Sequence, residues 1–318
     1  MSRQDELRLM VKVARMYYVQ GIRQQGITAR LQIHQSTISR LLKRAREANL
    51  VRFNVTTSPG IFAEIEDQLV SKFHLKDAMV VDCPDEEEPM VRALGSATGY
   101  FVETTVKPGT MIGISSWSRS LFSMVEALHP GDYCRGGKVV QILGGIGSTG
   151  IEHQAMYLAQ RLAALIGASA VLLQAPGVVG TAEARQVLAS DPSVREASEL
   201  FEQLDIALVG IGSMEPSQFL ATSGNVFSSA ERAQLKQRGA VGDICFRFFD
   251  AQGELVNSPL MQRVIGIDMA SLRRVRRVVG VAGGRRKVRA ILAALRGGWI
   301  NVLITDRRTA ESLLSKRP

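Results

Sequence analysis

Eight short apolar runs between residues 77 and 305 constrain the fold of this chain more than any other feature. Most of them are continuous rather than alternating, as expected for strands that are covered on both faces of a sheet. Helical patterns, for example at 151–166 and 282–296, separate most of the runs. This alternation predicts an α/β fold with a doubly wound, mostly parallel sheet. The predicted strands are 77–81, 111–114, 138–143, 168–173, 206–211, 243–249, 275–281 and 301–305.

The stretch at 27–48 has a different pattern, in which a polar break separates two helical segments. The second segment has an apolar stripe at helical spacing, formed by Ile38, Leu41, Leu42 and Ala45. Another face of this segment carries hydroxyls and cations and no carboxylate, which suits a helix that reads the major groove of DNA. The spacing is typical of a helix-turn-helix with its second helix as the reader. A small helical hairpin with a basic, solvated face would have the same pattern.

The distribution of charge favours the DNA-binding interpretation. Residues 1–52 contain 11 Lys and Arg and 3 Asp and Glu, a net charge of +8, whereas the whole chain carries +9. Such clustering around one helix is the electrostatic footprint of phosphate binding. The register of the helix predicts base contacts from Gln35, Ser36, Ser39 and Arg40, and phosphate contacts from Thr37, Lys43 and Arg44.

The rest of the N-terminal region is predicted to support this reader helix. A first helix is expected at 5–19, and a short strand at 50–55 is a candidate wing. The buried stripe of the first helix is predicted to consist of Leu7, Met10, Val11, Ala14, Tyr17 and Tyr18. Ser58, Pro59 and Gly60 then interrupt the pattern. We therefore predict a DNA-binding domain at 1–56 and a second, larger domain at 57–318.

Composition argues against several other classes of protein. The three cysteines, Cys83, Cys134 and Cys245, are widely spaced and odd in number, so neither a disulfide framework nor a zinc motif is expected. The four histidines are scattered, which argues against a metal site. No apolar signal segment begins the sequence, and no run reaches 18 apolar residues. These features predict a cytoplasmic protein without a metal or other cofactor.

Ligands of doubly wound sheets bind outside the carboxyl ends of the strands, and four loops of the sequence fall there. The first, at 113–120, offers four hydroxyls, a guanidinium and a helix N-terminus, a combination that suits phosphate or sugar hydroxyls. Ser115, Ser118 and Arg119 are the predicted contacts. A helix-capping cluster with a surface arginine explains the same residues equally well.

The second loop, at 144–150, contains Gly144 and a G-x-G-x-x-G match at Gly145, Gly147 and Gly150. A dinucleotide site needs an acidic residue about 20 positions further on to hold the ribose. No Asp or Glu occurs from 154 to 182, which argues against a nicotinamide cofactor. We predict instead that Gly144, Gly145 and Gly147 allow the backbone to approach another anionic or polyhydroxyl ligand closely.

The last two loops supply charged candidates for the same ligand. Asp243, in the loop at 239–243, can accept hydrogen bonds from sugar hydroxyls, although a helix cap or turn is an equally good explanation. In the loop at 280–287, Gly283 and Gly284 precede three cations at a helix N-terminus. Cations oppose the helix dipole there unless an anion sits at that end. Gly283 and Lys287 are therefore predicted effector contacts, with Lys287 as the anion contact, and a solvated basic patch is the alternative.

Both halves of the chain together resemble the SorC/DeoR-type sugar-responsive bacterial transcription regulators. The helix-turn-helix resemblance covers 18–47. The second half resembles the family's sugar-binding domain at Gly113-Ile114-Ser115, Leu143-Gly144-Gly145, Ala175-Pro176-Gly177, 209–213, 239–243, 281–284 with Lys287, and 300–306. That domain is similar to ribose-5-phosphate isomerase and glucosamine-6-phosphate deaminase. The resemblance implies operator DNA, a sugar or sugar-phosphate effector held by these loops, and a homodimer or homotetramer.

Two departures from the family pattern bear on the structure. Thr28, Gln32 and His34 stand where the family usually has Ala, Gly and Ser, so Gln32 is expected to adopt the left-handed turn that glycine would otherwise supply. In the first ligand loop the family often has Trp directly after the first Ser and then Gly, whereas this chain has an additional Ser before Trp117. The sequence therefore leaves open whether the effector is phosphorylated.

The expected function is control of a carbohydrate catabolic operon by an effector-responsive DNA-binding protein. An isomerase or deaminase acting on a sugar phosphate, with Asp243 as a base and an accessory basic domain, is the alternative. The chain has no G-x-S-x-G, H-E-x-x-H or Walker sequence that would indicate another enzyme class. The concentration of positive charge in one small domain favours the regulator.

Overall fold

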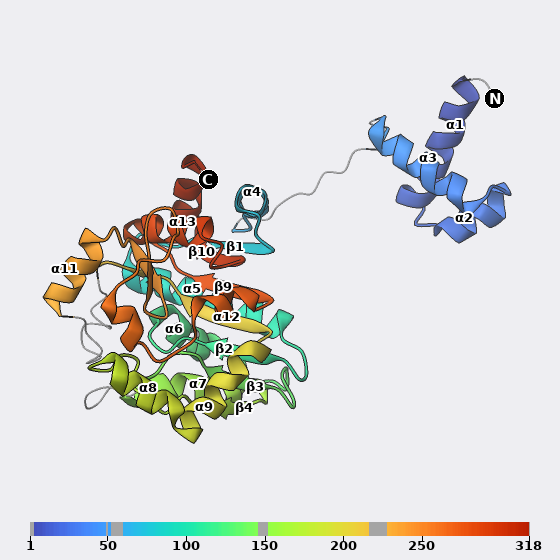
Figure 1. The fold of residues 1–318 in the computed structure, drawn as a ribbon. Coiled ribbons are helices and arrows are strands. Elements are labelled where there is room, and N and C mark those ends of the chain that lie inside the picture. The colour runs from blue at the N-terminus through green and yellow to red at the C-terminus, as the bar shows by residue number, and fades with distance from the viewer. Residues whose placement is uncertain (1–2, 49, 52–59, 146–151, 216–227, 318) are drawn as a thin grey trace. The chain divides into compact units, whose positions relative to one another are not determined.

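The structure is a computed structural model that describes residues 3–48, 50–51, 60–145, 152–215 and 228–317. The chain divides into two compact units, Met1–Ser58 and Pro59–Pro318. Figure 1 shows a helical N-terminal unit and a larger unit in which helices surround a central sheet. Each unit has its own hydrophobic core.

The N-terminal unit consists of α1 (Arg3–Ala14), the π-helix η1 (Arg15–Val19), α2 (Gln24–Leu31) and α3 (Gln35–Glu47). The predicted stripe of α3 is buried, and it packs with Ile27 of α2 and with residues of α1. Gln32 ends α2 in the left-handed conformation, with φ 53° and ψ 39°, as the sequence predicts. His34 occupies the N-cap position of α3, but its side chain makes no capping hydrogen bond.

The prediction for the first helix is partly wrong. Met10 and Ala14 are buried as expected, whereas Leu7 and Val11 are 40% and 41% exposed within the unit, and Tyr17 is exposed as well. The buried stripe consists instead of Met10, Val13 and Ala14, which are spaced at i, i+3 and i+4. Leu7 and Val11 lie beside this stripe. After Ala14 the helix widens to a π-helix, which shifts the register and brings Met16 into the core. The candidate wing lies largely outside the described residues.

The second unit contains a seven-stranded sheet in the order β1-β10-β9-β5-β2-β3-β4, in which every neighbouring pair is parallel. This confirms the predicted doubly wound α/β fold. Seven of the eight predicted strands form this sheet. Their bounds are β1 Asp77–Val81, β2 Met111–Ile114, β3 Lys138–Gln141, β4 Ser169–Val171, β5 Ile206–Gly210, β9 Arg277–Val281 and β10 Val302–Asp306.

Successive residues of the central strands enter separate cores on the two faces of the sheet. Ile206 and Leu208 pack with α5, α6 and α7, whereas Ala207 and Val209 pack with α4, α13 and α14. Because both faces are covered, the strands are apolar throughout, which explains the continuous runs in the sequence. These helices are α4 Ala63–Phe73, α5 Glu87–Thr105, α6 Arg119–Ala127, α7 Glu152–Ile166, α13 Val288–Arg296 and α14 Arg307–Ser315.

The predicted strand at 243–249 is wrong in its form. It is a tight hairpin, β7 (Gly242–Ile244) and β8 (Arg247–Phe249), which pairs antiparallel with β6 (Gly212–Ser213) in a separate three-stranded sheet. Cys245 and Phe246 form the turn with φ values of 51° and 58°. Glycine or asparagine normally marks such a turn, so the sequence carried no signal for it.

Further helices complete the described part of the second unit. Among the described residues, no helix is long and apolar enough to cross a membrane, and no cluster of potential metal ligands occurs. The remaining elements are α8 Ala182–Ser190, α9 Pro192–Glu199, η2 Leu200–Gln203, α11 Ser229–Gln237, η3 Pro259–Arg263, α12 Met269–Arg274 and η4 Arg285–Lys287.

Candidate functional site

A cavity of about 340 Å³ lies at the carboxyl ends of β2, β5 and β9. Its walls come from the loops after these three strands, from the start of α5, and from the β7–β8 hairpin. The chain continues from β2 to β3 on one side of the sheet, whereas β5 and β9 lie on the other side. The cavity therefore lies at the topological switch point, where ligands of doubly wound sheets bind.

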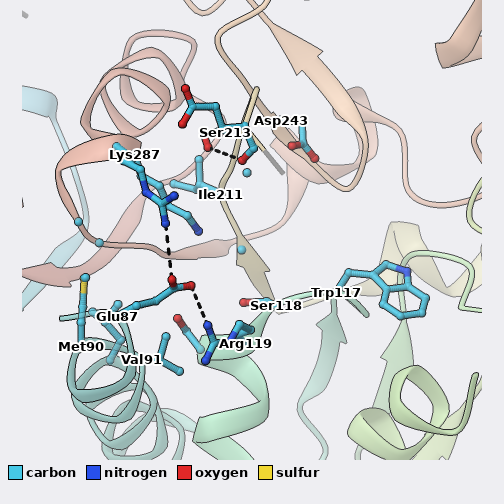
Figure 2. Close-up of a pocket in the computed structure, with 18 of the residues that line it drawn as sticks. Glu87, Met90, Val91, Trp117, Ser118, Arg119, Ile211, Ser213, Asp243 and Lys287 are labelled. Atoms are coloured by element: carbon cyan, nitrogen blue, oxygen red, sulfur yellow. Dashed lines mark hydrogen bonds and ion pairs between the residues drawn. The ribbon is translucent and has the colours of Figure 1, made fainter. Parts of the chain in front are cut away.

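The cavity brings together six of the nine predicted effector contacts: Ser115, Ser118, Arg119, Asp243, Gly283 and Lys287. Figure 2 shows Ser118, Arg119, Asp243 and Lys287 in this region. Gly144 and Gly145 are not among the described residues that line it, although the neighbouring Leu143 is. A side chain at Gly144 would meet the backbone oxygen of Ala175 at 2.6 Å, so this glycine has a packing role. Gly147 lies outside the described residues.

Asp243 is positioned by the small antiparallel sheet. Strand β6 follows directly after β5, and its Gly212 pairs with Asp243 of β7. A side chain at position 212 would collide with the Asp243 carboxylate, so glycine there allows the close approach. The backbone N–H of Phe246 donates a hydrogen bond to Asp243 Oδ2 at 3.1 Å. Burial raises the pKa of the Asp243 carboxyl to about 6, despite the opposing effects of this hydrogen bond and of Lys287.

Lys287 lies on the opposite loop, at the end of η4, and is partly buried. Burial lowers the pKa of its ammonium group, while Asp243 and Glu87 act in the opposite direction. Among the described residues, its Nζ is in no ion pair within 4.0 Å and no hydrogen bond. A carboxylate and an ammonium that face one cavity can accept from and donate to a polyhydroxyl ligand, or hold a ligand's anion.

The serine loop combines structural and accessible hydroxyls. Ser115 Oγ accepts a hydrogen bond from the backbone N–H of Gly210 at 3.3 Å, which ties the ends of β2 and β5 together. Ser116 is buried and donates to the backbone oxygen of Leu143 at 2.7 Å. Ser118 caps α6, where its Oγ accepts from Leu121 N–H at 3.4 Å. The predicted capping role is therefore present, and Ser118 still faces the cavity.

The cavity also has acidic residues that the sequence did not predict. Asp85, just before α5, and Glu87, the first residue of α5, line it together with Arg285 and Arg286. Glu87 pairs with Arg119 at 2.7 Å and with Arg286 at 3.5 Å. The four consecutive acidic residues at 85–88, which follow the predicted strand at 77–81, could have indicated these cavity residues. Their relation to the arginines depends on β1 and β9 lying in one sheet with only β10 between them, which the sequence alone does not reveal.

The high pKa of Asp243 makes a prediction about stability. Because folding favours its protonated form, the stability is greatest at acidic pH and falls as the pH rises from its ordinary pKa of 3.8 to about 6. At about 1.4 kcal/mol per pKa unit, the ionised carboxyl costs up to about 3 kcal/mol above pH 6. Asp243→Asn should raise the free energy of unfolding by that amount at pH 7.5, and the gain should disappear toward pH 4.

Urea denaturation at both pH values measures this effect. Asp67→Asn, on the exposed side of α4, is the matched control and should leave the unfolding free energy nearly unchanged. An Asp243→Asn variant that is less stable than the wild type at pH 7.5 would contradict the stated cost of burial.

On the N-terminal unit, the predicted reader helix presents a polar surface. Ser36, Ser39 and Arg40 are exposed, as are Gln35, Lys43 and Arg44, whereas Thr37 is half-buried. Lys43 lies 3.8 Å from Glu47 one turn away, and Arg44 pairs with Glu6 of α1. Both carboxylates are at the far end of α3 or on α1, so the surface formed by the first two turns of α3 stays free of acidic residues.

Comparisons with known proteins agree with both units. A family model described as "Putative sugar-binding domain" matches residues 60–315. The sorbitol operon regulator of Klebsiella pneumoniae is 36% identical over 317 residues, which are 99% of this chain and 100% of that protein. The deoxyribonucleoside regulator of Bacillus subtilis is 32% identical over 98% of each chain. The crystal structure of the full-length Klebsiella regulator has a TM-score of 0.73 and covers 98% of this chain and 99% of that one at 35% identity.

Proposed function

Because the chain belongs to the SorC family of sugar-binding transcriptional regulators, we propose that it binds operator DNA through α3 and responds to an effector in the cavity of its second unit. The effector is a sugar, sugar alcohol or sugar phosphate. Its binding changes the affinity for the operator and so controls a carbohydrate catabolic operon.

The observation that carries this proposal is that Asp243 and Lys287, one carboxylate and one ammonium, both line the cavity at the switch point. Burial disfavours the charged form of each side chain and shifts its pKa. Groups with shifted pKa values cluster at functional sites. Ser118 and Arg119 complete a set of donors and acceptors suited to a polyhydroxyl ligand. Gly144, Gly145 and Gly147 remain candidate backbone contacts from the adjoining loop.

The DNA contacts follow from the exposed side chains of α3. In this proposal Gln35, Ser36, Ser39 and Arg40 lie against base edges, and Thr37, Lys43 and Arg44 lie against phosphates. A forked guanidinium such as that of Arg40 suits guanine, and the net charge of +8 on residues 1–52 supplies sequence-independent affinity.

A homodimer or homotetramer completes the proposal. One reader helix contacts only a few base pairs, so useful specificity normally comes from two half-sites about one helical turn apart. Light scattering of the full chain at micromolar concentration, with and without DNA, should give at least twice the mass of 34.7 kDa. A monomeric mass under both conditions would contradict this part of the proposal.

Two assays on the full-length chain test the function. Selection from a random DNA library should enrich one sequence, and a thermal-shift panel of sugars, sugar alcohols and sugar phosphates should find a stabilising ligand. A ligand at one hundred times its Kd stabilises by about 2.7 kcal/mol. Failure to enrich any DNA sequence would contradict the regulatory function. Conversion of the stabilising ligand into a product, followed by NMR, would favour the isomerase or deaminase alternative.

A further inference from the structure

Glu87 lies between two arginines that come from different loops of the cavity. It is the first residue of α5, and its Oε1 is 2.7 Å from Arg119 Nη1 while its Oε2 is 3.5 Å from Arg286 Nη2. Arg119 follows β2 and Arg286 follows β9. The dashed lines in Figure 2 mark these contacts of Glu87. A carboxylate of the chain therefore occupies the position where an anionic group of a ligand would meet both guanidinium groups.

The described lining of the cavity is balanced in charge. It contains four carboxylates and four cations: Asp85, Glu87, Glu215 and Asp243, and Arg119, Arg285, Arg286 and Lys287. Asp85 lies 3.3 Å from Arg285 and 3.1 Å from Arg308, so these arginines are also paired. A dianionic phosphate would enter a neutral cavity in which each of these arginines already has a carboxylate partner. An uncharged polyol would leave the ion pairs intact.

Helix geometry explains why Glu87 holds this place. Arg119 is the first residue of α6, where a cation opposes the helix dipole, so a nearby anion stabilises it. Glu87 lies in the first turn of α5, where a carboxylate is favoured by the dipole of its own helix. Both preferences are satisfied by the ion pair, and the side chain of Arg119, only 29% exposed, is partly shielded from solvent. The same position would attract an external anion if Glu87 were neutral.

We propose that Glu87 is a specificity-determining residue, which competes with anionic ligands for Arg119 and Arg286 and makes the cavity favour an uncharged sugar or sugar alcohol over its phosphate monoester. This deepens the proposed function, on which the identity of the cavity as an effector site rests. Asp243, Lys287 and Ser118 provide the contacts for hydroxyls, and they do not require the arginines to change partners.

Inorganic phosphate is the probe that tests this proposal without knowledge of the effector. Isothermal titration of the full chain, at constant ionic strength, should show that Glu87→Gln binds phosphate about tenfold more tightly than the wild type, the size expected for a partly exposed ion pair that is replaced. Glu88 is unsuitable as a control because it also pairs with Arg119. Glu86→Gln removes the same charge one residue away, from an exposed side chain that does not line the cavity and that, among the described residues, is in no ion pair within 4.0 Å. It should change the phosphate affinity less than threefold.

A double variant locates the bound phosphate. Adding Arg119→Gln to Glu87→Gln should remove the gain in phosphate affinity. The proposal is overturned if Glu87→Gln binds phosphate no more tightly than the wild type, if Glu86→Gln gains as much, or if the gain persists without Arg119. Glu87→Ala repeats the test should the glutamine variant fold poorly. Because this experiment involves neither sugar nor DNA, its failure leaves the proposed regulatory function standing. That function is tested separately by the DNA selection and by the effect of sugars on DNA binding.

Discussion

Replacing Lys287 by methionine should abolish the response of DNA binding to the effector while leaving the effector-free affinity for DNA nearly unchanged. Lys287 is the one cavity cation that is partly buried and has no ion-pair partner within 4.0 Å among the described residues. A hydrogen bond from such an ammonium to a ligand is worth about 1.5–3 kcal/mol, or roughly 10- to 150-fold in affinity. Methionine keeps most of the aliphatic stem, so the packing of the loop should survive.

Titration of a fluorescent operator, with and without effector, measures this result. Lys107→Met is the matched control because it removes the same charge from an exposed position just before β2, at the opposite end of that strand. A normal effector response in the Lys287 variant would place the effector elsewhere. Loss of effector-free DNA binding would instead assign Lys287 a role in maintaining the fold or the oligomer.

The second large effect is expected at Arg40 on the reader helix. Arg40→Ala should weaken binding to the selected operator by about 1–3 kcal/mol, and it should relax the preference for one base at the position that Arg40 contacts. Arg40 is exposed on α3, one turn after Ser36, and it forms no ion pair with another described residue. Its guanidinium is therefore available to contact DNA. The effect should therefore fall mainly on the selected sequence.

Lys43→Ala is the matched comparison on the same helix. It should weaken binding to every DNA sequence by a similar factor and should reduce the salt dependence of binding by about one phosphate contact. Competition titrations with the selected operator and with scrambled DNA separate the two behaviours. If Arg40→Ala weakens both DNAs equally, or has no effect, the proposed register of α3 on the bases is wrong.

The strands of the main sheet were predictable because burial on both faces leaves a continuous apolar run in the sequence. The apolar run at 206–211, for example, predicts the bounds of β5, Ile206–Gly210, to within one residue. The stripe of α3 was equally clear, since apolar residues recur on one face and polar residues on another over about two turns. The left-handed turn at Gln32 was expected from the resemblance, because Gln32 stands where the family usually has glycine.

Other features depend on tertiary contacts that leave no periodic signal. The turn at Cys245 and Phe246 has two non-glycine residues at positive φ, so local sequence preference pointed to a continuous strand instead. The position of Asp243 depends on its pairing with Gly212, which follows a strand far away in the sequence. The bridging position of Glu87 needs three segments from β1, β2 and β9 to meet.

Binding of an effector in the cavity should change the affinity of the reader helix for operator DNA. Operator affinity of the full-length chain is determined by fluorescence anisotropy in the absence and in the saturating presence of the ligand found by thermal shift. We expect the Kd for DNA to change by about 5- to 150-fold, the range of typical allosteric coupling, and we expect Asp243→Asn to remove the change. A ligand that stabilises the wild type, loses this effect in Asp243→Asn, and yet leaves the operator Kd unchanged would contradict the account.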